Sequence, residues 1–132
     1  MIVHVDIGGE GRYPGAINVN PAMVTSTTGE PGRPIPNLVL GRAEQLPFET
    51  GVVDYVTVES APLRAGAADE IARVLAPGGT VRLHHPAGYA IGQGVHDAVA
   101  GAMRADPAAT VRLTLADDSV LTILRRAVDL LR

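Results

Sequence analysis

Residues that interrupt helices and strands are spread through the whole of this chain. Glycine occurs 15 times and proline 10 times among 132 residues, about one and a half times their usual combined share. Because both residues end or bend regular elements, long helices and strands have little room. A chain of this length forms one domain around one hydrophobic core. We therefore expect a single domain over residues 1–132, with short elements joined by many loops.

The remaining composition limits the classes of protein to which the chain can belong. Hydrophobic residues make up 46% and charged residues 19%, which excludes a disordered chain. The net charge of −3 argues against a nucleic-acid-binding protein, whose surface is basic. With no cysteine, the chain has neither disulfides nor thiolate metal ligands. No apolar stretch is long enough to cross a membrane, and we expect a cytoplasmic protein without a metal site.

Hydrophobic periodicity predicts strands that alternate with helices in the middle of the chain. Residues 67–75 and 95–103 carry apolar side chains at helical spacing. Short runs of β-branched and apolar residues predict seven strands, at 2–7, 16–19, 38–40, 52–59, 80–84, 111–115 and 120–124. The last two strands form a hairpin around residues 117–119, and residues 127–132 either continue as a helix or fray. This order is typical of an α/β fold, mostly parallel, with an antiparallel C-terminal hairpin.

Three consecutive segments in the middle of the chain carry a set of motifs. Residues 41–48 read Gly-Arg-Ala-Glu-Gln-Leu-Pro-Phe, residues 53–56 read Val-Asp-Tyr-Val, and residues 70–79 read Glu-Ile-Ala-Arg-Val-Leu-Ala-Pro-Gly-Gly. In this order and spacing they resemble class I S-adenosylmethionine-dependent methyltransferases, which have G-D-A-x-x-L-P-F, D-x-V and E-x-x-R-V-L-x-P-G-G. The resemblance implies a trimmed Rossmann-like methyltransferase fold with S-adenosylmethionine as the cofactor.

The resemblance also implies which residues surround that cofactor. Residues 5–9, Val-Asp-Ile-Gly-Gly, are similar to the first strand and glycine turn of these enzymes, where the backbone approaches the methionine portion of the cofactor. In the family, an acidic residue then holds the ribose hydroxyls and a carboxylate faces the adenine. The residues expected to bind the cofactor follow the first three strands or end them: Asp6, Gly8, Glu10, Asn20, Arg42, Ala43 and Glu44.

Several of these positions depart from the family pattern. Glu10 and Arg12 stand where the family has its second and third glycines. Asn20 replaces the ribose-binding acid, and Arg42 replaces the adenine-facing aspartate. An amide oxygen still accepts a hydrogen bond, whereas a guanidinium cannot. Because the first loop gains an acid and the third gains a base, we predict an ion pair between Glu10 and Arg42 across the cleft.

Two side chains at the ends of later strands are candidates for catalysis. Glu59 could orient or deprotonate a nucleophile; otherwise it is a solvated carboxylate or the cap of the next helix. His84 lies at the same edge, where it could act as a base near neutral pH or simply be hydrogen-bonded. Since neighbours on a strand point to opposite faces, His84 and His85 cannot both face one pocket. We expect His4 to be structural and His96 to be exposed on its helix.

The connections between the first strands leave no room for the usual helices. A crossover between parallel strands usually needs about 10–12 residues, but only eight separate Ile7 from Ala16. Residues 21–37 are numerous enough, but they contain four prolines and no helical period. One face of the sheet should therefore be thinly covered beside these strands and present an apolar surface. Such a surface predicts a homodimer or a protein partner.

These observations favour one function and leave two alternatives open. By resemblance, the protein transfers a methyl group from S-adenosylmethionine to an acceptor that the sequence does not identify. In the first alternative, the degenerate fold binds no cofactor and acts as a protein-interaction or effector module. In the second, Arg42 binds a phosphate or carboxylate group, and Glu59 with a histidine performs hydrolysis.

Overall fold

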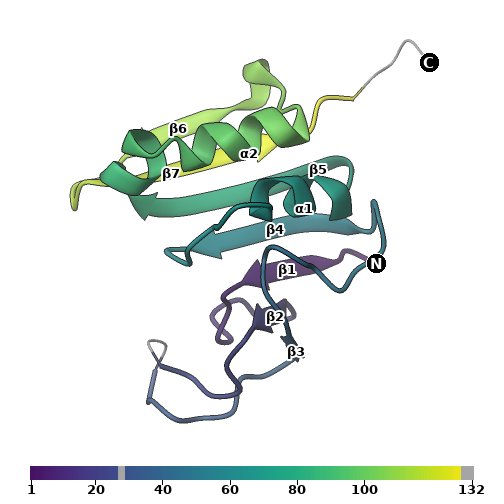
Figure 1. Cartoon of the computed structure of the whole chain (residues 1–132), viewed down its shortest axis with the longest axis vertical. Coiled ribbons are helices and arrows are strands. Elements are labelled where there is room, and N and C mark those ends of the chain that lie inside the picture. Colours follow the sequence, from purple (N-terminus) through teal and green to yellow (C-terminus); the bar gives the residue numbers. More distant parts are fainter. Residues whose placement is uncertain (27–28, 129–132) are drawn as a thin grey trace.

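A single sheet runs through the structure, a computed structural model that describes residues 1–26 and 29–128. These residues form seven strands in the order β3-β2-β1-β4-β5-β7-β6 (Figure 1). The strands are β1 (His4–Ile7), β2 (Ile17–Asn20), β3 (Leu38–Leu40), β4 (Val53–Glu59), β5 (Leu75–Pro86), β6 (Val111–Thr114) and β7 (Ser119–Arg125). Strands β1 to β5 pair in parallel, whereas β7 pairs antiparallel with β5 and β6. The predicted fold class, a Rossmann-like methyltransferase fold, is confirmed.

The helices lie where the periodicity predicts them. Helix α1 (Ala67–Val74) ends one residue before the predicted end, and α2 (Val95–Met103) has the predicted bounds. Two single turns have no periodic pattern and were not predicted, a π-helical turn, η1 (Gly88–Gly92), and a 3₁₀ turn, η2 (Pro107–Ala109).

The C-terminal half differs most from prediction at two places, apart from shifts of one or two residues at other strand ends. Strand β5 begins earlier than expected, because the chain leaves α1 in an extended conformation at Leu75, which pairs with Val53 of β4. Of residues 127–132, for which a helix or fraying was predicted, residues 127 and 128 are not helical and the others lie outside the described residues.

Both long helices cover the same face of the sheet, and the core lies beneath them (Figure 1). Alternate strand positions such as Val5, Val56 and Val81 point toward the helices and are fully buried. Ile71 of α1 and Val99 of α2 are buried in the same cluster. Burial of this cluster is the main source of stability for a chain with so few regular elements.

Histidine 96 belongs to the buried face of α2, so the prediction of an exposed side chain is wrong. The buried residues of this helix are His96, Val99 and Met103, at the spacing i, i+3 and i+7 that defines one helix face. The predicted apolar stripe began instead at Val95, which is only partly buried.

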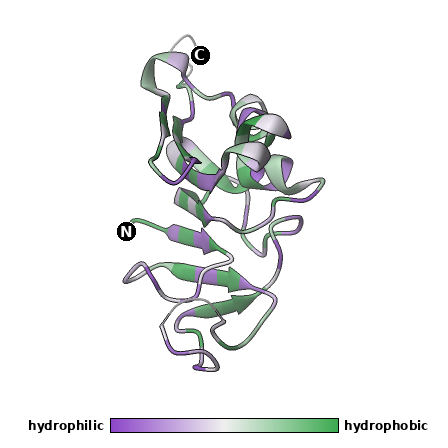
Figure 2. Ribbon diagram, turned by 90° about the vertical axis from the view of Figure 1, so that its left-hand side faces the viewer, coloured by the Kyte–Doolittle hydropathy of each residue, from purple (hydrophilic) through white to green (hydrophobic). Residues whose placement is uncertain are grey.

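No helix among residues 1–26 and 29–128 lies over the opposite face of the sheet, which we call the open face. Its centre is polar, because alternate positions of β1, β4 and β5 point away from the helices; examples are His4, Thr57 and Arg82. Figure 2 shows this alternation of hydrophilic and hydrophobic residues along the strand that follows the N-terminus. The expectation of an apolar surface beside the first strands is therefore confirmed only at β3, where Leu40 is 57% exposed on this face. Further exposed apolar side chains lie at the other end of the face, where Val111 and Leu113 of β6 are 44% and 50% exposed.

The short β1–β2 connection covers part of the open face with one aromatic side chain. The ring of Tyr13 lies 5.3 Å from that of His4, and its hydroxyl donates to Glu59 Oε1 at 2.5 Å. Tyr13 therefore shields the polar centre of the face where a crossover helix is missing.

The loop between β3 and β4 is fastened to α1 by the acidic and basic residues of the motif over residues 70–79. Leu46 N donates to Glu70 Oε1 at 2.9 Å, and Arg73 donates back to Leu46 O at 3.0 Å. The adjacent guanidinium also lowers the pKa of Glu70. At the start of β4, Asp54 accepts a hydrogen bond from Val3 N at 2.8 Å, which ties the N-terminal residues to this strand.

Membrane-spanning geometry does not occur in the described part of the chain. None of its helices has both the length and the apolar character needed to cross a bilayer.

Candidate functional site

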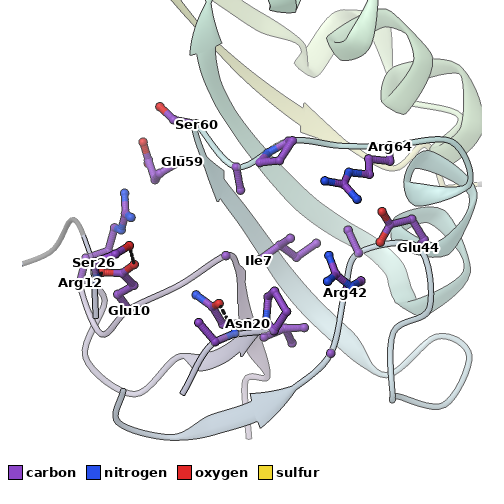
Figure 3. Close-up of a pocket in the computed structure, with 18 residues that line it drawn as sticks. Ile7, Glu10, Arg12, Asn20, Ser26, Arg42, Glu44, Glu59, Ser60 and Arg64 are labelled. Carbon is purple, nitrogen blue, oxygen red and sulfur yellow. Dashed lines mark hydrogen bonds between the residues drawn. The ribbon is translucent and has the colours of Figure 1, made fainter. Parts of the chain in front are cut away.

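A cavity of about 380 Å³ opens at the carboxyl ends of β1 to β4 (Figure 3). Its walls come from the ends of these strands and the loops that follow them. In an open α/β sheet the carboxyl ends of parallel strands, beside the point where strand order reverses, are the usual place for a ligand. Here the order reverses at β1, which lies between β2 and β4.

The floor of the cavity is a close contact between two loops, and this contact requires a glycine. Gly8 has a φ of +72°, and a Cβ built on it would lie 2.6 Å from Ala61 Cβ. Its N–H donates to Val19 O at 2.7 Å, which fixes the turn after β1 against β2. A side chain at this position would therefore both strain the backbone and push the loop after β4 away.

The predicted cofactor-binding residues line the cavity with one exception. Gly8, Glu10, Asn20, Arg42, Ala43 and Glu44 all contribute to its walls. Asp6 does not; it is fully buried and turned toward the open face, where Thr57 donates to its Oδ1 at 2.9 Å. Its Oδ2 accepts no hydrogen bond from the described residues, and Arg12 Nε lies 3.8 Å away. Burial raises the pKa of Asp6, against the smaller opposing effects of Thr57 and Arg12.

The ion pair predicted between Glu10 and Arg42 is not formed. Figure 3 shows Glu10 beside Ser26 and Arg12 on one side of the cavity and Arg42 on the other. The Glu10 carboxylate accepts from the N–H and from the hydroxyl of Ser26, both at 2.9 Å. Glu10 therefore anchors the long β2–β3 loop to the β1–β2 connection and leaves the cavity open.

Asparagine 20 supports the cavity wall through two backbone contacts. Its Nδ2 donates to Gly9 O at 3.2 Å, and its Oδ1 accepts from Ala22 N at 2.9 Å. The amide oxygen has a second lone pair, so Asn20 can still accept a bond from a ligand hydroxyl.

The two predicted catalytic residues are brought together at the edge of the cavity. Glu59 lines the cavity, and its Oε2 lies 2.8 Å from Nδ1 of His84 on the next strand. Tyr13 and Arg82 both donate to its Oε1. Since three donors surround one carboxylate that is only 10% exposed, Glu59 is held in one orientation.

A chain of polar side chains continues from His84 to the surface. His84 does not line the cavity; its Nε2 lies 2.8 Å from Ser119 Oγ. Ser119 in turn donates to Asp117 Oδ1 at 2.5 Å, in the exposed turn of the hairpin. This hydrogen bond lowers the pKa of Asp117.

Sequence motifs did not point to Tyr13, Arg82, Ser26 or Ser119. For Arg82 a signal existed, because the spacing i, i+2 places it on the same strand face as His84. The other three reach the site through loops or the hairpin turn, whose paths no periodic pattern predicts.

Comparison with known proteins shows the family of the chain. A family model described as a methyltransferase domain matches residues 12–83, which is more than half of the chain. No curated protein sequence is detectably similar to it.

Solved structures share the fold at low sequence identity. A variant of the 16S rRNA (adenine(1408)-N(1))-methyltransferase from Catenulisporales acidiphilia, solved with S-adenosylmethionine, is 20% identical, with a TM-score of 0.59, over 97% of this chain and 85% of that chain. A S-adenosylmethionine-dependent methyltransferase from Thermotoga maritima, a possible histamine N-methyltransferase, is 15% identical, with a TM-score of 0.61, over 95% and 82%. A putative methyltransferase from Haloferax volcanii, in complex with the Trm112 methyltransferase activator, is 18% identical, with a TM-score of 0.60, over 95% and 82%.

The similarity to solved structures establishes the fold, and the family model establishes the family. Both agree with the motifs over residues 41–48, 53–56 and 70–79. The chain belongs to the methyltransferase domain family, as a class I S-adenosylmethionine-dependent member.

Proposed function

We propose that the protein transfers a methyl group from S-adenosylmethionine, bound in the cavity, to an acceptor placed beside Glu59. The observation that carries this proposal is the open cavity at the carboxyl ends of β1 to β4, with Gly8 at its floor. Family membership supplies the type of reaction, and the Catenulisporales acidiphilia structure shows the cofactor on a similar fold.

The residues of the cavity fit this cofactor. A volume of about 380 Å³ lies in the range of about 300–1,000 Å³ that is common for small-molecule sites. Gly8 leaves its backbone accessible to the methionine portion, and the Asn20 amide oxygen is available to a ribose hydroxyl. Ala43 and Arg42 line the part assigned to adenine. The Glu10 carboxylate, which would oppose the carboxylate of the cofactor, is partly compensated by the two Ser26 donors.

The cofactor supplies a methyl group that is already activated for transfer, so the protein acts mainly by positioning the acceptor. We propose that Glu59 accepts a hydrogen bond from the acceptor and takes its proton. Arg82 and His84 hold the carboxylate in its orientation. The chain from His84 through Ser119 to Asp117 then connects Glu59 with the exposed turn, where a proton can reach solvent.

Calorimetric titration with S-adenosylmethionine and S-adenosylhomocysteine tests the proposal. We expect micromolar dissociation constants for both. Absence of binding at millimolar ligand would remove the enzyme proposal and leave the alternative, an interaction module without cofactor.

Two alanine substitutions give this titration a matched control. Gly8→Ala places a Cβ 2.6 Å from Ala61 at a φ of +72°, so we expect binding to weaken at least tenfold, by about 1.4 kcal/mol or more. Gly15→Ala places alanine at a similar φ of +82°, but no atom lies within 4 Å of its Cβ. It carries the same backbone strain without the crowding, and its dissociation constants should match those of the wild type. Equal binding by both variants would contradict the assignment of this cavity to the cofactor.

We also propose that a second copy of the chain covers the apolar end of the open face. Val111 and Leu113 are exposed there, beside the partly buried Leu121 and Ile123 of β7. That a methyltransferase of this fold forms a complex with a protein, as in the Haloferax volcanii structure, makes a protein partner plausible. The cytoplasmic location that the sequence predicts stays part of this proposal.

Light scattering at micromolar concentration measures this association. We expect twice the mass of one chain for the wild type and the mass of one chain for Leu113→Arg, because a charge at this position opposes burial of the face. Ile91→Arg is the control, since Ile91 is equally exposed but belongs to η1 and not to a strand of the open face. A wild-type protein that scatters as a single chain would contradict the homodimer.

A further inference from the structure

Beneath α2, a line of hydrogen-bonded side chains runs from the edge of the sheet to the cavity wall. Arg112 Nε lies 3.3 Å from Thr122 Oγ1, which lies 2.8 Å from His96 Nδ1. His96 Nε2 lies 2.8 Å from His85 Nδ1, and His85 Nε2 lies 2.8 Å from Ala61 O. Both histidines are buried, with exposed fractions of 0% and 1%.

The two ends of this line determine the direction of every hydrogen bond in it. The Ala61 carbonyl only accepts, so His85 Nε2 carries a hydrogen. Neutral His85 then accepts at Nδ1 from His96 Nε2, and neutral His96 accepts at Nδ1 from the Thr122 hydroxyl. Thr122 Oγ1 accepts from Arg112, which only donates. With both rings neutral, every group in the line is satisfied in one arrangement.

A proton on either ring would break this arrangement. A charged imidazole has hydrogens on both nitrogens, so two N–H groups would face each other or the threonine hydroxyl would lose its acceptor. Burial lowers the pKa of His85, and it lowers the pKa of His96 to about 4. Electrostatic repulsion by a proton on His85 and by the Arg112 guanidinium acts in the same direction on His96, and attraction by Asp97 opposes it. The neutral arrangement is therefore the one present near neutral pH.

The line ends on the loop that forms the floor of the cavity. Ala61 lines the cavity and is the residue against which Gly8 packs. The same loop is held a second time by Tyr89, whose hydroxyl accepts from Leu63 N at 2.6 Å. The Tyr89 ring lies 5.0 Å from the ring of His85, so the two contacts that hold the loop are adjacent to each other.

We propose that His85 and His96 are positioning residues that hold the loop after β4, and with it Ala61, against the glycine turn of the cofactor site. Neither residue touches the cavity; each acts through the Ala61 carbonyl. That these residues hold the loop follows from the hydrogen bonds alone, whereas their effect on cofactor affinity rests on the proposed function.

Two measurements at neutral pH test the two parts separately. Hydrogen exchange of the backbone amides of Ser60, Ala61, Leu63 and Arg64, without ligand, reports how firmly the loop is held. The dissociation constant of S-adenosylhomocysteine reports the consequence for the cavity. The global free energy of unfolding of each variant is measured beside them, so that local loosening can be separated from general loss of stability.

Three substitutions distinguish positioning from packing. His96→Leu fills the space but removes the donor to His85, and we expect exchange and the dissociation constant each to rise about tenfold. His96→Gln keeps one donor for His85 and one acceptor for Thr122, and should restore both values to within about threefold of the wild type. Thr122→Val removes only the hydroxyl, keeps the shape of the side chain, and should give a smaller loosening in the same direction. This last variant keeps the test available if leucine at position 96 prevents folding.

The outcomes separate the two proposals. Faster exchange in His96→Leu and its restoration in His96→Gln support the positioning role, even if the wild type binds no S-adenosylhomocysteine and the proposed function fails. Unchanged exchange in both His96→Leu and Thr122→Val would overturn it. Equal loss in His96→Leu and His96→Gln would also overturn it, because shape rather than hydrogen bonding would then be responsible.

Discussion

We expect the Arg126→Leu variant to have a free energy of unfolding about 3 kcal/mol lower than that of the wild type. This value is the sum expected for several charged hydrogen bonds, reduced because the side chain is partly exposed. The guanidinium of Arg126 donates to Leu75 O at 2.6 Å, to Ala72 O, and to Met103 O at 3.3 Å. These carbonyls end α1 and α2, where the last groups of a helix lack partners within it. A positive charge there also interacts favourably with both helix dipoles. Leucine would leave the carbonyls without their donors at the junction of the only two long helices among the described residues.

Urea unfolding followed by circular dichroism measures this loss. Arg125→Leu is the matched control, because Arg125 is the adjacent residue and its side chain is exposed; we expect a change within about 0.5 kcal/mol. Arg126→Lys should lie between the two, since an ammonium reaches fewer of the carbonyls than a planar guanidinium does. Equal losses at positions 125 and 126 would show that Arg126 is not the link between the helix ends.

The parts of this fold that could be predicted from the sequence are those with a local cause. Strand β3 has the predicted bounds because proline and glycine lie in the loops on either side of it. Helix α2 has the predicted bounds because the spacing of its apolar residues is helical. The motif over residues 41–79 predicts the family and therefore part of the cavity wall. The role of Arg126 could not be predicted in this way, because its partners lie 23 to 54 residues away.

Two expectations, one wrong and one wrong in part, could have been corrected from the sequence itself. The polar centre of the open face follows from the alternation in β1 and β4, where His4 and Asp6 alternate with Val5 and Ile7. The burial of His96 follows from its spacing with Val99 and Met103, but a histidine is usually counted as a polar residue. For the open face, the expectation rested on the missing crossover helices and not on the alternation of residues. For His96, it rested on the polarity of histidine and not on the helical spacing. In both cases the periodic pattern gave the correct answer.

The Glu10–Arg42 pair was wrong for a different reason. It was inferred from a change of charge at two family positions, which says nothing about the path of the loop over residues 21–37. That loop carries no periodic pattern, yet it places Ser26 beside Glu10. A carboxylate binds the nearest donors, so the loop decided the partner and the arginine remained in the opposite wall.

The largest pH effect should come from His96. Its pKa is about 4 in the folded chain, below the ordinary 6.5. Between these values the unfolded chain binds more protons, so the free energy of unfolding falls as pH falls. The contribution of neutral His96 is complete above about pH 6.5, and its loss reaches about 3 kcal/mol near pH 4. Arg112 and His85 beside His96, and His84 on the other face of the sheet, disfavour its charge, while Asp97 favours it.

Urea midpoints measured between pH 7.5 and pH 4 for the wild type and for His96→Gln test this effect. Other groups with shifted pKa values, such as Asp6 with a raised pKa and Glu70 with a lowered one, contribute to both proteins and cancel in the difference. The glutamine variant should therefore lose less stability on acidification. His4→Gln is the control, because the pKa of His4 is also lowered by burial, but this side chain lies on the open face and is only partly buried. If the urea midpoints of the wild type and of His96→Gln changed with pH in parallel, His96 would take up its proton without breaking its contacts. The arrangement of hydrogen bonds from Arg112 to Ala61 with neutral histidines would then not contribute to stability.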